Sequence, residues 1–536
     1  MPKITRSLSD KFGLTLILFL FISLGAAIRL FFVLRSDFPI NDGGMLYQMT
    51  RELSQNHFIL PTFTGYNLAR IPYAYPPLPF YLAGSLEALL GCDLYVLVRL
   101  LPVIFNILAI PAFFDLSRQI LKNDYQALHA SLAFTIIPPS YEWLIMGGGL
   151  TRSPAVLFSI LALGQFVRAL KTETRRPIIL AILFTCLTGY CHMEVLWVTV
   201  VFMGLVVLIS ARQRKGWLVL IATGCGAAML MAPYVLYVIN LHGVSPFISA
   251  MQSGQFNWAA SIGKLLLVDI TGEYFFTPIL VFAMLGFGRA LLTRDCLLPA
   301  WTLAAVLSDP RSVERSLVIP VCMLAAIGLD KVIIPGMAYT ANAIGDLSDN
   351  QKSALKQNIF PNLICALLIT YMFIRSAVTG PFYILREGAT LQTLSQADRQ
   401  AMQWVADNTP HESSFLVLTP PSIWEKNEWT EWFPVLAQRR SVTTVQGSEW
   451  LPDGQFTFQE MLYDAVLGCI PQEIICIERV TQEMGVSFTH VYINGQVMDT
   501  NLQIPYTLPI ATALRDSIDY ELIYEQNGIT IYKKDH

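Results

Sequence analysis

The sequence TLILFLFISLGAAIRLFFVL, from Thr15 to Leu34, and the sequence RSDFPINDGG that follows it, from Arg35 to Gly44, decide the fold. The first is an apolar segment of about 20 residues, the length at which a helix crosses about 30 Å of hydrocarbon. No small-residue cleavage site follows it, so we interpret it as a retained membrane span rather than a removed signal peptide. The second places an acidic residue, Asp42, just beyond the end of that span.

The composition indicates that much of the chain lies in lipid. Of its 536 residues, 54% are hydrophobic and 14% are charged. Soluble globular proteins carry about 25% charged residues. The net charge is -3, and no long basic or acidic tract indicates a nucleic-acid partner. We therefore expect an α-helical polytopic membrane protein.

Apolar segments of suitable length recur along the chain and predict about eleven spans. They lie near residues 13–34, 96–117, 126–146, 149–168, 177–192, 195–210, 216–239, 275–292, 296–308, 316–335 and 359–378. Lys and Arg concentrate in alternate connections, and short cytoplasmic loops retain these residues, so the N-terminus is predicted to be cytoplasmic. With an odd number of spans, Asp42 and the C-terminal region lie on the outer face of the cell (plasma) membrane.

The first outer loop, residues 35–95, is predicted to be amphipathic. Apolar residues spaced along one face predict a helix that begins just after Gly43-Gly44. Pro76-Pro77 cannot continue a helix, so a second, interfacial helix is predicted from Leu78 to Leu90. We expect this loop to lie flat on the membrane.

Beyond the last predicted span the sequence becomes polar, and residues 380–536 are predicted to form an extracytoplasmic α/β domain. Ser395-x-x-Asp398 resembles a capping box at the start of a helix that runs to Asn408. Strands are predicted at Ser414–Thr419, Ile474–Glu478, His490–Ile493, Glu521–Glu525 and Ile529–Lys533, the last two joined through Asn527-Gly528.

The nine cysteines do not follow a metal-binding pattern. Neither CxxC nor a His-Cys zinc spacing occurs, so no metal site and no cofactor are predicted, and a divalent metal is not indicated. Only Cys469 and Cys476 share a region predicted to be soluble, and the sequence leaves open whether they form a disulfide. The other cysteines are interpreted as small apolar residues within spans.

Asp42 is the first candidate for catalysis, and two interpretations of it are open. It could cap the helix that follows Gly43-Gly44, as loop carboxylates often do. Alternatively, a carboxylate fixed at the membrane surface can take a proton from a hydroxyl group while a lipid-linked donor approaches sideways from the bilayer. Asp37 and Glu52 are alternative bases in the same loop.

Four motifs follow one another between Asn41 and Pro102. They are NDGGMLYQMTREL (41–53), ILP (59–61), YPPLPFY (75–81) and VRLLP (98–102). Their order resembles the start of the GT-C superfamily of polyprenyl-phosphate-dependent glycosyltransferases, most closely the aminoarabinose transferases and protein O-mannosyltransferases. The resemblance covers roughly the first 210 residues and implies a GT-C-like transmembrane domain over residues 1–379, in which Asp42 is the general base.

The resemblance implies an inverting transfer of a hexosyl or pentosyl group from a polyprenyl-phosphate donor to a glycan, lipid or protein acceptor. Relatives usually have Asp-Glu where this chain has Asn41-Asp42, and a basic residue where it has Tyr75. Tyr75 is retained as a candidate donor-binding residue. A cation that binds the donor phosphate must come from elsewhere.

Candidate cations lie at the predicted outer ends of spans. Gly147-Gly148-Gly149 opens a span with exposed backbone N–H groups, and Arg152 adds charge, which suits an anion. The glycine triplet could equally form only a tight turn. His192 stands where relatives often have a Lys, although it could simply pair with Glu194.

Arg311 and Arg315 are the remaining candidates for the donor phosphate. Their loop resembles the arginine-containing loop that faces the lipid phosphate in this superfamily. Pairing of one arginine with Glu314 is the ordinary alternative, but two arginines in five residues are more than that pair needs.

Trp432, Trp450 and Glu449 are candidate acceptor-binding residues in the C-terminal domain. Indole rings stack on the apolar faces of sugars, and carboxylates accept hydrogen bonds from sugar hydroxyls. The alternative is that these tryptophans are core residues or membrane-interface anchors.

Two other classes of protein remain open. A polytopic secondary transporter would have charged or broken helices near mid-bilayer and an inverted repeat, whereas the unusual polar residues here gather at predicted outer ends of spans. In a non-catalytic lipid or glycan assembly protein, replacing Asp42 would have no effect. No Walker loop and no GxSxG motif supports ATP-driven transport or serine hydrolysis.

Overall fold

The computed structural model describes residues 8–253, 271, 273, 278–309, 311–337, 391–420, 422–472, 474–496 and 505–535 of the chain. The predicted span at 359–378 and the predicted domain boundary between residues 379 and 380 lie outside the described residues. The start of the predicted span at 275–292 does too.

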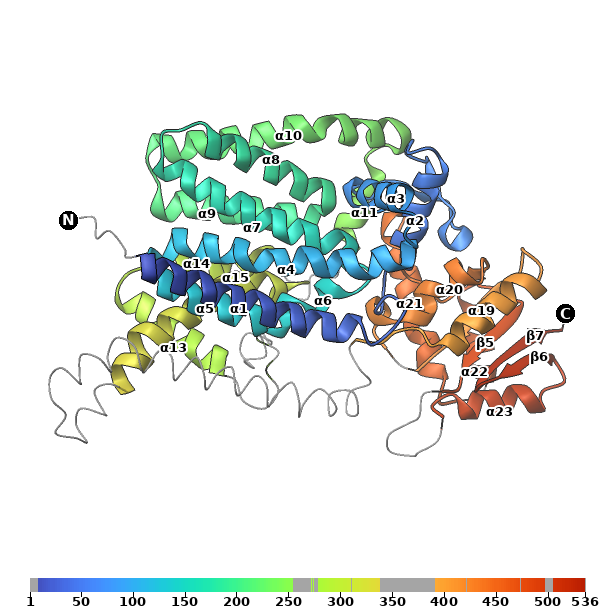
Figure 1. The fold of residues 1–536 in the computed structure, drawn as a ribbon. Helices are drawn as coiled ribbons and strands as arrows, with labels where there is room; N and C mark the ends of the chain where they lie inside the picture. Colours follow the sequence, from blue (N-terminus) through green and yellow to red (C-terminus); the bar gives the residue numbers. More distant parts are fainter. Residues whose placement is uncertain are drawn as a thin grey trace.

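Long apolar helices form a bundle (Figure 1). Those long and apolar enough to cross a membrane are α1 (Leu8–Val33), α4 (Leu94–Leu121), α7 (Gly149–Lys171), α9 (Met193–Ser210), α10 (Arg214–His242) and α15 (Val313–Gly328), which continues through the π-helical segment η3 (Leu329–Ile333) to Met337. Helices α13 (Pro278–Leu292) and α14 (Leu297–Ser308) are bent by 119° and pass the same test only as a pair. The protein is a multi-pass membrane protein. The described residues contain six such helices, or seven if the bent pair is one span, so the predicted count of eleven is not confirmed.

The segment predicted as one span at 126–146 is broken. Helix α5 (Asp124–Ile136) ends before Pro138-Pro139, and a 3-10 turn η2 (Pro138–Ser140) and the short helix α6 (Glu142–Ile145) follow. Proline lacks the N–H that a continuing helix needs, which explains the break. The short helices α8 (Arg176–Cys191) and α11 (Ser245–Gln252) complete this part of the described chain.

The first outer loop has the two predicted helices, α2 (Gly44–Gln55) and α3 (Leu78–Leu90). Between them a small hairpin is formed by β1 (Phe63–Thr64) and β2 (Ile71–Pro72), with a 3-10 turn η1 (Tyr66–Leu68) at its tip. The proline pair before α3 fixes where that helix begins, as the sequence predicts.

The C-terminal region is an α/β domain built on a five-stranded sheet of order β4-β3-β5-β7-β6. The strands are β3 (Ser414–Leu418), β4 (Arg440–Ser441), β5 (His490–Asn494), β6 (Tyr520–Gln526) and β7 (Ile529–Lys534). β3 pairs in parallel with β4 and β5, whereas β7 pairs antiparallel with β5 and β6. The predicted hairpin is confirmed: Asn527 and Gly528 both have positive φ, as a two-residue hairpin turn requires.

Helices and 3-10 turns surround this sheet. They are α19 (Gln396–Asn408), η5 (Trp424–Lys426), α20 (Glu428–Leu436), η6 (Ser448–Trp450), α21 (Gln455–Cys469), α22 (Ile474–Glu483) and α23 (Leu508–Asp516). The Ser395 side chain caps α19 by accepting from the Asp398 N–H at 3.0 Å, as predicted. The strand predicted at Ile474–Glu478 is wrong, because these residues begin α22. Ile474 and Ile477 are buried on one face while Ile475 is 67% exposed, which is helical spacing.

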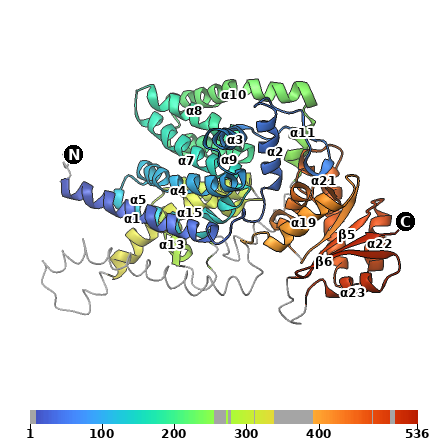
Figure 2. The same cartoon turned by 45° about the vertical axis from the view of Figure 1, so that its right-hand side comes forward.

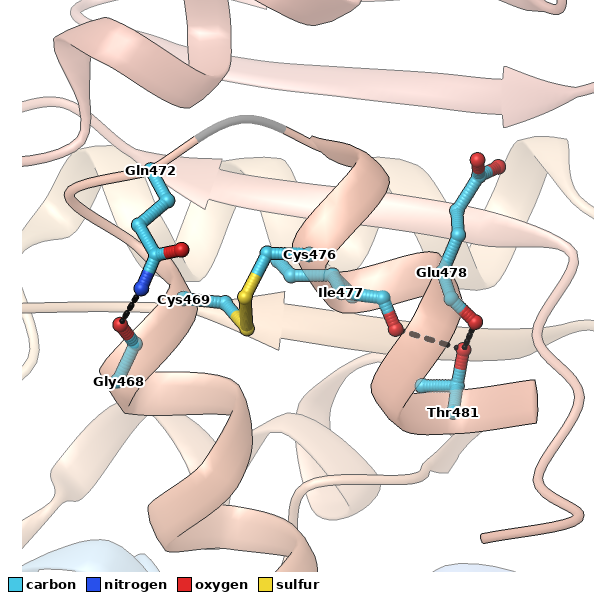
Figure 3. The surroundings of a disulfide bond; sticks show 7 residues. All are labelled: Gly468, Cys469, Gln472, Cys476, Ile477, Glu478 and Thr481. Carbon is cyan, nitrogen blue, oxygen red and sulfur yellow. Dashed lines mark hydrogen bonds between the residues drawn. A yellow bond between two sulfur atoms is a disulfide. The ribbon is translucent and has the colours of Figure 1, made fainter. Parts of the chain in front are cut away.

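Cys469 and Cys476 form a disulfide that joins the end of α21 to α22, with their Cα atoms 5.6 Å apart (Figure 3). The question that the sequence leaves open is thus resolved in favour of a bond. The described cysteines of the bundle and the first loop are free: Cys92, Cys186, Cys191, Cys225, Cys296 and Cys322.

The C-terminal domain packs against the first outer loop at one end of the bundle (Figure 2). Side chains of both segments share one hydrophobic core, among them Met45, Tyr66, Phe80, Phe415, Trp432 and Trp450. The first turn of α1 lies at the other end of the bundle (Figure 1). The loop that carries Asp42 is therefore buried between the bundle and the domain.

Candidate active site

Asp42 lies in a tight turn between α1 and α2. The residues on either side, Asn41 and Gly43, have left-handed backbone conformations with φ of 48° and 112°. Gly43, not Asp42, is the N-cap residue of α2, and it provides no side-chain hydrogen bond. The interpretation of Asp42 as the cap of that helix is therefore wrong. Its side chain is buried, with 6% of the residue exposed.

The carboxylate of Asp42 is bound at the N-terminus of α7. Oδ1 accepts a hydrogen bond from the Gly148 N–H at 2.7 Å, and Oδ2 accepts one from Arg152 Nη2 at 2.8 Å. The partial positive charge of a helix N-terminus stabilises an anion, and a charged donor strengthens the contact. In this structure the anion at the glycine triplet is the side chain of Asp42.

The glycine triplet allows this close approach. A Cβ on Gly147 would lie 1.9 Å from the Asp42 carbonyl oxygen, and a Cβ on Gly148 would lie 2.2 Å from Asp42 Oδ2. A Cβ on Gly149 would lie 2.1 Å from the carbonyl oxygen of Leu144. A side chain at Gly147 would displace the backbone of Asp42, one at Gly148 would displace the Asp42 carboxylate, and one at Gly149 would displace the backbone of Leu144.

Arg152 has further partners on the side of Trp143. Its guanidinium lies 5.6 Å from the centre of the Trp143 ring, and Nη1 donates to the Trp143 carbonyl oxygen at 3.4 Å. Lys426, from the C-terminal domain, places its Nζ 4.9 Å from the same ring. Two cations from distant parts of the chain therefore meet at one indole. Tyr75 lies close by, with its hydroxyl 3.1 Å from Thr151 Oγ1.

The other predicted donor-binding residues form a second group. Arg315 Nη2 pairs with Glu194 Oε1 at 3.0 Å and lies 3.9 Å from Asp309 Oδ2. His192 has no hydrogen-bond partner for its buried Nδ1 among the described residues. It lies within electrostatic reach of Arg315, Arg152 and Arg311.

The two groups are close to each other. The ring of Tyr75 lies 6.2 Å from that of His192, and the charges of Arg152 and Glu194 both act on Tyr75. Arg311 is exposed at the edge of this region. The structure thus brings the predicted donor-binding residues together around Tyr75 and His192.

A cavity opens between the helices beside Arg315. It holds about 550 Å³ of empty space, including space open to the surroundings. Five polar residues take part in its lining: Ser140, Ser159, Asp309, Arg315 and Ser316. The other lining residues are apolar: Phe134, Pro139, Leu144, Val156, Ile160, Val195, Val198, Phe202, Val318 and Ile319. A mostly apolar lining that includes charged side chains suits an amphipathic lipid.

Glu431, on α20, is a second carboxylate at the Asp42 turn. Its Oε1 accepts from the Gly43 N–H at 2.8 Å and the Met45 N–H at 3.4 Å. Burial, together with the negative charge of Asp42, raises the pKa of Glu431 to about 8. The sequence gives no sign of this contact, because Gly43 and Glu431 are 388 residues apart and belong to different predicted domains.

The candidate acceptor residues have different surroundings. Trp432 is 0% exposed, and its Nε1 donates to the Asn41 carbonyl oxygen at 2.9 Å. It offers no free face to a sugar, so the prediction that Trp432 stacks on an acceptor is wrong and the alternative of a core residue is right. The Trp450 ring lies 5.4 Å from Tyr75. Burial raises the pKa of the neighbouring Glu449 to about 7.

The alternative bases have other partners. Asp37 forms a two-oxygen ion pair with Arg399 of α19, at 2.9 and 3.0 Å. Glu52 Oε1 accepts from the Gln48 side chain and from the Gly65 N–H, both at 2.8 Å. In the part of the chain that the structure describes, no three His, Cys, Asp or Glu side chains are grouped as a metal site would require.

No protein-family model matches the sequence, and no curated protein matches it in sequence. Comparison with solved structures defines the class of fold: it is that of the GT-C superfamily, as the motif order suggests. This confirms the predicted fold class, a helical GT-C-like membrane part with a C-terminal sheet domain.

Three of these structures illustrate the likeness. The archaeal oligosaccharyltransferase AglB of Archaeoglobus fulgidus, solved with an inhibitory peptide and a dolichol-phosphate, has a TM-score of 0.62 at 14% identity, over 99% of this chain and 75% of its own. ArnT of Cupriavidus metallidurans, solved with undecaprenyl phosphate, has a TM-score of 0.54 at 12% identity, over 96% of this chain and 97% of its own. The mycobacterial arabinofuranosyltransferase AftD has a TM-score of 0.55 at 12% identity, over 96% of this chain and 40% of its own.

Proposed function

We propose that this protein is a membrane glycosyltransferase that transfers a sugar from a polyprenyl-phosphate donor to an acceptor hydroxyl on the outer face of the membrane. The observation that carries the proposal is the contact between Asp42 and Arg152, a carboxylate and a cation 2.8 Å apart at the start of α7 in a GT-C fold. Two structures with this fold were solved with a polyprenyl phosphate bound. The acceptor is a glycan, a lipid or a protein.

In this proposal the donor phosphate binds among Arg152, His192, Arg311 and Arg315. The three arginines all lie within electrostatic reach of His192, so a phosphate beside His192 meets several positive charges. The apolar cavity beside Arg315 takes part of the isoprenoid chain. Tyr75, between the two groups, contributes its hydroxyl to the donor.

Arg152 links donor binding to the base. In the structure its guanidinium is the cationic partner of Asp42 Oδ2. A phosphate that attracts Arg152 leaves this oxygen free to accept a proton. Binding of the donor therefore prepares the base.

The transfer itself is a single displacement. The acceptor hydroxyl gives its proton to Asp42 while its oxygen forms a bond to the anomeric carbon. The bond between that carbon and the phosphate oxygen breaks, its electron pair leaves with the phosphate, and the anomeric configuration inverts. The nearby cations stabilise the charge that develops on the leaving phosphate. The half-buried Glu449 binds the acceptor, whereas Trp450, a buried core residue like Trp432, supports the site by packing near Tyr75.

The orientation follows from the same proposal. The first turn of α1 and the C-terminal domain lie at opposite ends of the bundle, which supports a cytoplasmic N-terminus and an extracytoplasmic domain. The Cys469–Cys476 disulfide supports this placement, because disulfides persist mainly outside the cytoplasm.

The Asp42→Asn variant tests the function. We expect wild-type protein to transfer or release sugar from one of a panel of labelled polyprenyl-phosphate sugars, and the variant to lose about 100-fold or more of that rate because asparagine cannot accept the proton. Asp37→Asn is the matched control, since Asp37 belongs to the same loop but pairs with Arg399. Equal rates for Asp42→Asn and wild type would contradict the proposal.

A non-catalytic assembly protein is the second candidate. The observation that favours it is that both oxygens of Asp42 already have hydrogen-bond partners, as in a purely structural ion pair. Under this alternative the purified wild-type protein transfers no sugar from any donor in the panel.

A further inference from the structure

We infer that Glu431 and Trp432 position Asp42, so that the C-terminal domain completes the catalytic site rather than only covering it. This inference rests on the proposed function, because it concerns the residue proposed as the base. Neither residue is proposed to touch the donor or the acceptor.

Two consecutive residues of α20 hold the backbone on both sides of Asp42. Before it, the Asn41 carbonyl oxygen accepts from Trp432 Nε1 at 2.9 Å. After it, the Gly43 N–H donates to Glu431 Oε1 at 2.8 Å. The peptide groups that set the direction of the Asp42 side chain are thus both bound to the C-terminal domain.

The turn needs such support. Asn41 and Gly43 both have left-handed conformations, which most residues other than glycine and asparagine avoid, so contacts that hold Asn41 in this conformation help to fix the turn. Asn41 makes three further hydrogen bonds to residues of the C-terminal region. Its N–H donates to the Gln392 carbonyl oxygen at 2.8 Å, its Oδ1 accepts from the Gln392 N–H at 3.2 Å, and its Nδ2 donates to the Lys426 carbonyl oxygen at 3.0 Å.

Glu431 also supplies a cap that α2 lacks in its own sequence. The first N–H groups of a helix have no partner within it, and Gly43 has no side chain to accept from them. Glu431 Oε1 accepts from Gly43 and Met45 instead, from a buried position with 4% of the residue exposed. Glu431 of the C-terminal domain therefore fixes both the start of α2 and the turn that precedes it.

The packing leaves little freedom for another arrangement. A Cβ on Gly44 would lie 2.6 Å from the Glu431 carbonyl oxygen. The Trp432 ring lies 4.6 Å from Phe38 and 5.9 Å from Tyr47, so it is enclosed by residues that precede and follow the turn.

Substitutions of Glu431 separate a positioning role from a general loss of structure. We expect Glu431→Ala to lower kcat about 10- to 100-fold, because a small displacement of a base is costly, with KM for the donor within about twofold. Glu431→Gln should keep kcat within about threefold, since its amide oxygen can accept the same two N–H groups. Glu428→Ala is the matched control: Glu428 lies on the same helix, is 2% exposed and has no hydrogen bond to residues 41–45 among the described residues.

Hydrogen exchange of full-length protein in detergent gives a readout that does not depend on activity. Amides of residues 41–46 should exchange faster in Glu431→Ala, and at the wild-type rate in Glu431→Gln and Glu428→Ala. Trp432→Phe, which removes the Nε1 donor but keeps an aromatic ring of smaller volume, should also speed exchange at these residues and lower kcat about fivefold. If Glu431→Ala fails to fold, the Trp432→Phe variant still tests the inference.

The outcomes are distinct. Unchanged exchange at residues 41–46 in both Glu431→Ala and Trp432→Phe overturns the inference, and so does faster exchange with kcat unchanged. If wild-type protein transfers no sugar at all, the proposed function fails. Faster exchange in Glu431→Ala would in that case still support the hold of the C-terminal domain on the turn.

Discussion

At the scale of single residues, glycines without side chains allow Asp42 and the start of α7 to lie in close contact. Asp42 reaches Gly148 and Arg152 only because Gly147 and Gly148 lack side chains. The sequence presents the glycine triplet as either a phosphate site or a tight turn, and in the structure its Gly148 N–H binds the carboxylate of Asp42. Its chemistry therefore depends on a residue more than 100 positions earlier in the chain.

Gly148→Ala tests this requirement. The added Cβ would lie 2.2 Å from Asp42 Oδ2, so either the carboxylate or the start of α7 must move. We expect sugar transfer to fall at least about 10-fold and the unfolding free energy to fall by about 1–3 kcal/mol. Donor-dependent transfer and thermal unfolding in detergent measure the two effects.

Gly224→Ala is the control for that substitution, because a Cβ there meets no atom within 4 Å. It should leave both quantities near their wild-type values. Wild-type transfer by Gly148→Ala would mean that the contact between Asp42 and α7 has no role in the reaction.

The sequence was informative about some of these residues and silent about others. Asp42 and Arg152 are both candidates from their local motifs, and the structure shows that they touch. Glu431 and Lys426 could not be assigned to the site, because their contacts with it depend on how the C-terminal domain packs. No local pattern encodes a contact across 388 residues.

At the scale of elements, the sequence predicted the ends of helices and strands correctly where prolines, capping residues or turn residues mark them. The proline pair before α3, the Ser395 cap of α19 and the Asn527-Gly528 turn are all where the sequence indicates. Prediction failed for Ile474–Glu478, where a run of five residues is too short to separate strand from helix by periodicity. The single span predicted at 126–146 was also wrong. The high hydropathy of this segment indicated one continuous helix, although Pro138-Pro139 interrupts it.

The disulfide between α21 and α22 should stabilise the C-terminal domain. It closes a short loop of 7 residues in sequence separation, for which the loss of chain entropy in the unfolded state is worth about 2–3 kcal/mol. Cys469→Ala/Cys476→Ala should unfold at lower denaturant concentration than wild type. Dithiothreitol should destabilise wild type but not the double variant, and equal sensitivity of both proteins would show that the bond is absent in solution.

At the scale of the whole molecule, the first outer loop and the C-terminal domain share a single core. Several carboxylates are buried near it. Burial raises the pKa of Glu428 to about 8, and burial with the charge of Asp42 does the same for Glu431. An unfolded glutamate has a pKa of about 4.3, so these groups hold protons in the folded protein that the unfolded chain releases.

Stability should therefore decrease as pH rises. Between about pH 6.5 and 8, above the pKa of an unfolded histidine, these two glutamates bind fewer protons in the unfolded than in the folded state, which favours unfolding at higher pH. Below about pH 6.5, His490 acts in the opposite direction, because burial lowers its pKa to about 4. We expect the unfolding temperature at pH 8 to lie several degrees below that at pH 6.5. Glu431→Gln should reduce this difference, because the amide does not titrate, whereas Glu521→Gln, an exposed position on β6, should not. A rise in unfolding temperature toward pH 8 would contradict the burial of these groups in protonated form.

The hydrogen bond between Trp432 and the Asp42 turn can form only late in synthesis of the chain. The two partners, Asn41 and Trp432, are 391 positions apart. A ribosome adds about 5–20 residues per second, so α20 is made about 20–80 s after the turn that it binds. During that interval part of the apolar surface of the nascent loop is uncovered. In a chain that ends before α20, the loop has no Trp432 to bind. The ability to react is thus acquired only when nearly the whole polypeptide has been translated and delivered to one side of the membrane.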